Sequence, residues 1–145
     1  MPLFVAIAVV TLMIGCKKDE TMDTSSGNGK FTFGSSNYSG PCIATPSSFC
    51  SGSTDVTITA NNGANNTIVY NMPEASSGTF NLVDGWKNGG DCQLYMLATA
   101  GASKVYAATK GTLTKTGAKS YTFSITMTDT PGSTATTTVT GSGTY

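Results

Sequence analysis

The chain has 145 residues and a formal net charge of zero, because eight lysines balance eight acids and neither arginine nor histidine occurs. Nucleic-acid-binding proteins carry a basic stripe, and bidentate phosphate recognition favours arginine, so we expect no nucleic-acid partner. The length allows one domain of ordinary size beside a short terminal segment.

The first fifteen residues have the composition of a secretory signal. The run from Leu3 to Ile14, LFVAIAVVTLMI, is apolar apart from Thr11. Its twelve residues fit the apolar part of a signal peptide, which has about 7–15 residues. They are too few to span a bilayer, which takes about 20 residues. We therefore expect residues 1–15 to be a cleaved signal peptide.

A cysteine follows this run. Gly15 precedes Cys16, and the stretch MIGC resembles the lipobox of bacterial lipoproteins, with Met13 in place of the usual leucine and no basic residue before the apolar run. The resemblance implies that Cys16 becomes the first residue of the mature protein and carries acyl chains, palmitate among them. The alternative is an unmodified cysteine behind an ordinary buried segment.

Residues 16–29 are predicted to contain a flexible tether. The sequence KKDETMDTSSGNG after Cys16 is rich in small and polar residues and has no periodicity, as is typical of linkers. Its KKDE start resembles the charged stretch behind the lipidated cysteine of small Bacteroidota-type surface lipoproteins. The resemblance implies lipid anchoring in the bacterial outer membrane with exposure at the cell surface, and it leaves the choice of leaflet open.

Residues 30–145 alternate between apolar and polar side chains with the period of β-strands, and no window has helical spacing. The predicted strands are 55–60, 66–72, 78–83, 92–100, 104–115, 120–129 and 135–145. The predicted core side chains are Val56, Ile58, Ala60, Ile68, Tyr70, Met72, Tyr121, Phe123, Ile125, Met127, Val139 and Tyr145. The pattern indicates an all-β domain, either an antiparallel β-sandwich or a small barrel of about eight strands.

Turn residues divide these strands. NNGANN, between the first two, predicts a hairpin over 56–72. Gly111 predicts a bulge or bend inside its strand, and Pro131 before Gly132 predicts a type II turn. Threonine and serine on the outward positions argue against a lipid-facing wall.

Three cysteines remain after Cys16. An exported domain meets an oxidising compartment, so we expect a disulfide, and all three pairings are open. We favour Cys42 with Cys50, because the intervening IATPSSF is typical of a loop that one local bridge would pin. Cys92 would then be a buried free thiol.

Catalytic motifs are missing from the sequence. It has no histidine for a triad or zinc site, and no GxSxG, P-loop or GxGxxG. The carboxylates that could form an acid–base pair are Asp55, Glu74, Asp84, Asp91 and Asp129. Because most of them lie beside turns, where solvated residues are expected, we predict no catalytic residue, no metal site and no cofactor.

The loop LVDGWKNGGDC, residues 82–92, holds the only tryptophan. Trp86 with Asp84, Lys87, Asn88 and Asp91 is a candidate patch for a ligand or a partner, in which the indole stacks on a sugar ring or anchors a protein. In the alternative, Trp86 folds back as a lid over one end of the β-domain. A calcium site from Asp84, Asn88 and Asp91 would need more oxygens.

These features predict a lipid-anchored, non-catalytic binding or accessory module at the bacterial outer membrane, which includes a subunit docked to a larger membrane protein. The first alternative is a structural or adhesive surface subunit that assembles through exposed strand edges. The second is a hydrolase.

Overall fold

The computed structural model describes residues 26–145. The predicted signal peptide, Cys16 and most of the predicted tether lie outside the described residues. The elements are β1 (Ser26–Phe33), β2 (Ser36–Pro46), β3 (Thr54–Thr59), β4 (Asn65–Tyr70), β5 (Gly78–Asn81), α1 (Gly85–Asn88), β6 (Tyr95–Ala100), β7 (Lys104–Gly117), β8 (Ser120–Thr128) and β9 (Thr137–Thr144). Residues 26–29, expected in the tether, belong to β1 instead.

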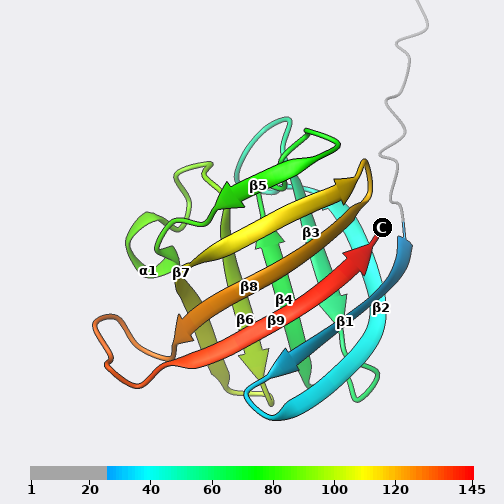
Figure 1. Cartoon of the computed structure of the whole chain (residues 1–145). Helices are drawn as coiled ribbons and strands as arrows, with labels where there is room; N and C mark the ends of the chain where they lie inside the picture. The colour runs from blue at the N-terminus through cyan, green and yellow to red at the C-terminus, as the bar shows by residue number, and fades with distance from the viewer. Residues whose placement is uncertain (1–25) are drawn as a thin grey trace, which may run out of the picture.

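The strands form one antiparallel sheet that closes into an eight-stranded barrel (Figure 1). The order around the barrel is β1, β2, β3, β4, β6, β7, β8 and β9, and β9 pairs with β1. Strand β5 lies outside this ring, where it pairs with the second half of β7 beyond the part that pairs with β6. The predicted all-β antiparallel fold is confirmed. Of the two predicted architectures, the structure has the small barrel and not the β-sandwich.

The first two strands were not predicted, because glycines stand where apolar side chains would mark a strand. A side chain at Gly27 would collide with the backbone oxygen of Thr144, and one at Gly40 with that of Thr59. These glycines let segments pass close to one another, so they are required by packing and leave no hydrophobic signal in the sequence.

The barrel interior is filled by side chains, as is usual for eight strands. The largest fully buried ones are Tyr121, Phe31, Ile58, Met96 and Leu113. The predicted inward face of β8 is confirmed, since all four of its apolar side chains are buried.

Glycines of β9 make room for the aromatic rings of β8. Tyr121 lies directly opposite Gly143, and Phe123 lies opposite Gly141. A Cβ at Gly143 would lie 2.7 Å from the Tyr121 ring and 2.8 Å from the Cys42 sulfur. This arrangement, in which an aromatic ring covers a cross-strand glycine, also occurs in designed sheets.

In strand β4, the face that points into the core is the opposite of the predicted one. Direct cross-strand partners share a face, and Thr67 and Val69 lie opposite Ile58 and Val56, which point inward. Ile68 and Tyr70 therefore face outward, and the prediction that they enter the core is wrong. Because a shift of one residue exchanges the two faces of a strand, a well-formed alternation does not by itself decide which face is buried.

Pairing with β3 decided which face of β4 is buried, although the face with Ile68 and Tyr70 is the more apolar one. Thr67 is completely buried and its hydroxyl has no hydrogen-bond partner among the described residues. Met72 is buried as predicted, because Asn71 has a left-handed backbone (φ 56°) that turns the chain back toward the interior.

Two predicted irregularities differ in outcome. The register shift in β7 lies between Ala108 and Lys110, so the bulge is at Thr109 and not at Gly111. Gly111 has a positive φ of 144° and lets β8 pass close to its Cα. The turn at Pro131 is confirmed, since Gly132 has φ 76° and Ser133 N donates to Thr130 O at 3.2 Å.

The disulfide joins Cys50 to Cys92, so the favoured pairing of Cys42 with Cys50 is wrong. Cys42 lies within β2, where its side chain points into the barrel and its sulfur is 3.7 Å from the Tyr121 hydroxyl. The segment after Cys42 continues as strand to Pro46, and only the residues beyond it form a loop. Cys50 in that loop meets Cys92, which follows α1, with Cα atoms 5.5 Å apart.

We expect Gly143→Ala to lower the free energy of unfolding by about 2–3 kcal/mol, because the new Cβ overpacks the interior against Tyr121 and Cys42. Urea denaturation measures the change. Gly117→Ala is the matched control: its Cβ would have 3.6 Å to the nearest atom, on Ser120. Equal losses in the two variants would contradict the packing argument.

We expect removal of the disulfide by the double substitution C50A/C92A to lower the free energy of unfolding by about 4 kcal/mol, since the bridge closes a loop over a separation of 42 residues. Urea denaturation under oxidising conditions measures it, and C42A is the control that retains the bridge. A cross-linked peptide joining Cys42 to Cys50 in a non-reducing digest would refute the assignment.

Candidate functional site

The short helix α1 is built on the outer wall of the barrel, not at its end. Asp84 caps it, since its carboxylate accepts from Trp86 N at 2.9 Å. Gly85 lets the helix lie close to Ala107 of β7 and Tyr95 of β6, since an added Cβ would be only 3.3–3.4 Å from their side chains. The helix therefore covers part of β6 and β7 from outside (Figure 1).

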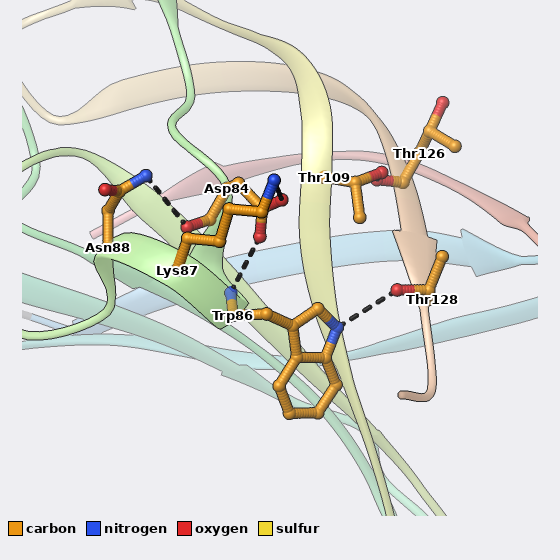
Figure 2. A network of polar contacts seen from close by, with 7 residues as sticks. All are labelled: Asp84, Trp86, Lys87, Asn88, Thr109, Thr126 and Thr128. Carbon is orange, nitrogen blue, oxygen red and sulfur yellow. Dashed lines mark hydrogen bonds and ion pairs between the residues drawn. The ribbon is translucent and has the colours of Figure 1, made fainter. Parts of the chain in front are cut away.

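Trp86 joins this helix to the wall. Its indole Nε1 donates to the Thr128 hydroxyl of β8 at 3.0 Å (Figure 2). The indole is half-buried and Thr128 is buried, although the alternation of β8 predicted an outward, solvated threonine there. Trp86 thus folds back onto the barrel, as in the predicted lid. It packs on the outer wall at β8, however, and not over an end of the domain.

The predicted patch is only partly assembled. Lys87 Nζ lies 3.9 Å from the Asp84 carboxylate, and Asn88 Nδ2 donates to the Asp84 carbonyl at 3.3 Å (Figure 2). The Lys87–Asp84 pair contributes little to stability, because the lysine side chain is 80% exposed. Asp91 is exposed, and only its backbone N contacts this group, through Asn88 O at 3.2 Å.

A groove of about 500 Å³ lies beside this group on the outer wall. Asp84 and Lys87 form one side of it, and the turn after β8, with Gly132 and Ser133, forms another. The other lining residues are Thr109, Lys110, Thr126, Thr128 and Thr138 of the strands and Thr136 just before β9. We call this feature the threonine groove.

The sequence reasoning missed the threonines of the groove. The bulge at Thr109 displaces it from the alternation of β7, and its hydroxyl donates to the Thr126 carbonyl at 3.2 Å. The outward alternation of Thr126 and Thr138 was visible in the sequence, but nothing in it showed that their strands lie side by side with α1.

The groove offers many neutral hydroxyls, two lysines and one carboxylate. The Asp84 carboxylate is already committed to the helix cap and to Lys87. A general acid–base pair needs two carboxylates facing a common substrate, and Asp84 is the only acid among the residues that line this groove. The arrangement is suited to hydrogen bonding of a bound molecule.

The other carboxylates have different surroundings. The Asp55 carboxylate accepts from Asn71 N at 3.0 Å and so fixes the left-handed residue after β4. Glu74, Asp91 and Asp129 are exposed in loops. Within residues 26–145 no group of three or more His, Cys, Asp or Glu side chains could hold a metal ion.

A second cluster of titratable groups lies inside the barrel, at the end where β1 begins and β9 ends. Lys115 is 2% exposed, and its Nζ donates to the Tyr145 hydroxyl and the Ala118 carbonyl, both at 2.7 Å. Tyr121 lies between Tyr145 and Cys42. No carboxylate contacts this lysine in the described part of the chain.

Burial sets the protonation of this cluster. Desolvation lowers the pKa of Lys115. It raises the pKa of Tyr121 far above its ordinary range, with further contributions from Cys42 and Tyr145, and it raises the pKa of Cys42 more than the hydrogen bond from Tyr121 lowers it. The Cys42 thiol is therefore a buried apolar group and not a nucleophile.

We expect Lys115 to contribute stability that rises with pH between its lowered pKa and about 10, because the unfolded chain there binds a proton that native Lys115 has lost. Cys42 and the buried tyrosines, whose pKa values are raised, contribute the opposite slope, from about pH 8.5 for the thiol and about pH 10 for the tyrosines, because they ionise first in the unfolded chain.

Lys115→Met should remove this rising contribution, so that the stability difference between the variant and the unmodified protein changes with pH, and it should leave stability at pH 7 equal or higher, because an apolar side chain replaces a desolvated charge. Urea denaturation across pH 7–11 measures the profile. The control is K119M, which removes an exposed lysine from the adjoining turn. A loss of more than about 2 kcal/mol at pH 7 in K115M would mean that the two hydrogen bonds outweigh desolvation.

No protein-family model, no curated protein and no solved structure matched this chain. Across residues 26–145, no helix has both the length and the apolar character required to cross a membrane.

Proposed function

We propose that the protein is a lipid-anchored, non-catalytic binding or accessory module of the bacterial outer membrane, exposed at the cell surface. The anchor is assigned from the MIGC sequence that ends at Cys16 and the charged KKDE behind it. More than one acyl chain makes membrane anchoring effectively stable, so the acyl chains alone would keep the barrel attached.

The threonine groove carries the binding part of this proposal. It is the place where the predicted loop residues Asp84 and Lys87 meet side chains from β7, β8 and the β8–β9 turn. The interior offers no comparable site, because its volume is occupied by large side chains such as Tyr121, Phe31 and Met96. A ligand would therefore bind on the outer wall.

The lining favours a neutral ligand rich in hydroxyl groups, such as a segment of glycan. Threonine and serine hydroxyls both donate and accept hydrogen bonds, which matches the alternating donors and acceptors of a sugar. Lys87 and Lys110 can donate hydrogen bonds to such a ligand at its edges. The half-buried indole of Trp86 stiffens the wall through Thr128, and it is not itself among the lining residues.

The closed sheet weighs against the alternative of assembly through strand edges. Each of the eight barrel strands pairs on both sides, and closure removes the edges that edge-to-edge association needs. Among the described strands only β5, with four residues, keeps a free edge.

Mass spectrometry of the native protein tests the anchor. We expect its first residue to be Cys16 with acyl chains on the N-terminal peptide. A protein that keeps residues 1–15, or that carries an unmodified thiol at Cys16, would refute the proposed location.

Titration with neutral oligosaccharides, observed by amide NMR shifts, tests the groove. We expect shifts at Thr126 and Thr138, and a loss of affinity of about tenfold in Thr126→Val, which removes one hydroxyl at nearly constant shape. Ser124→Ala is the matched control, because Ser124 is exposed on the same strand and face but lies outside the groove. Equal affinity of T126V and the unmodified protein would exclude the groove as the site.

A further inference from the structure

Phe49 is the most exposed large apolar side chain among the described residues, at 71%. It lies in the loop of residues 47–53 between β2 and β3, and the neighbouring Cys50 is fixed by the disulfide to Cys92. The Ser47 hydroxyl accepts from Phe49 N at 3.4 Å and from Cys50 N at 3.3 Å. Local bonds therefore hold this loop in a shape that presents Phe49 to solvent.

The loop lies at the end of the barrel where the chain enters it. Ser26, the first residue of β1, pairs with Ile43 of β2, and β2 runs only three residues further before the loop begins. The start of β1 and the β2–β3 connection occupy the same end of the molecule (Figure 1). Val105, the other exposed large apolar residue of the described chain, follows the start of β7 at the opposite end.

The distance from the anchor is short. Nine residues lie between Cys16 and Ser26, and a random coil of this length would span about 18 Å on average. The headgroup region adds several ångströms on each side of the hydrocarbon core. An anchored barrel therefore has this end within reach of the membrane surface on average.

The chemistry of the loop fits an interfacial position. Its sequence SSFCSGS contains no charged residue, so an approach to the headgroups would not strip water from an ion. Burial of one phenylalanine side chain gives a modest favourable free energy. This is too little to bind a membrane alone, but it is enough to orient a protein that an acyl anchor already holds there.

We propose that the loop of residues 47–53 is a second membrane contact, in which Phe49 enters the interfacial region of the same bilayer that holds the lipid on Cys16. This inference rests on the proposed anchoring. The β8–β9 turn that borders the threonine groove lies at the opposite end of the barrel, so the contact would point that turn away from the membrane.

The test uses the full lipidated protein, purified from membranes and reconstituted into phosphatidylethanolamine–phosphatidylglycerol vesicles with doxyl-labelled lipids. Phe49→Trp is made in a background with Trp86→Phe, which leaves one tryptophan. The matched control is V105W in the same background. We expect doxyl lipids to quench the F49W signal at least about twofold more strongly than that of V105W, with a blue-shifted emission for F49W alone.

Equal quenching of the two variants, with acylated Cys16 in the same sample by mass spectrometry, would overturn the membrane contact and leave the anchor intact. An unmodified Cys16 in native protein would overturn the anchor and, with it, this inference. Circular dichroism of both variants confirms that the barrel is folded before the comparison is made.

Discussion

The structure depends on the pairing of the last strand with the first. β9 hydrogen-bonds to β8 on one side and to β1 on the other, so one strand closes the barrel. The close approach is possible because Gly141 and Gly143 have no side chains where Phe123 and Tyr121 lie. Closure then places the start of β1, the end of β9 and the buried Lys115–Tyr145 contact at the same end. The end of the barrel at which the described chain begins follows from that single arrangement.

A filled barrel restricts where function can lie. With aromatic and aliphatic side chains occupying the interior, binding capacity remains on the wall and at the two ends. The wall carries α1, held by Trp86 to Thr128, and beside it the threonine groove. One end carries the rigid loop with Phe49, and the other carries the turn that borders the groove. In the proposed arrangement, attachment uses one end of the barrel, and recognition uses the groove on its wall between α1 and the β8–β9 turn.

Several expectations from the sequence failed for the same reason. Alternation predicted β3, β8 and β9 correctly, but for β4 it selected the face with Ile68 and Tyr70, which pairing with β3 turns outward. Tyr70 instead stacks on Tyr95 with ring centres 4.5 Å apart. Local spacing likewise favoured the bridge from Cys42 to Cys50, whereas β2 carries Cys42 into the interior and Cys50 meets Cys92 from a distant loop. Both errors arise because contacts far apart in the sequence overrule local pattern.

The sequence by itself determined the all-β class, the approximate strand number and most turns, because alternation and turn residues act over a few neighbouring positions. It also supplied the motif from which the anchor is proposed, since a cleavage and acylation signal is read as a linear stretch. Only the tertiary structure decided between sandwich and barrel, the orientation of β4, the disulfide and the composition of the groove. Each of these depends on which distant strands become neighbours, and the glycines that permit those approaches give no apolar signal in the chain.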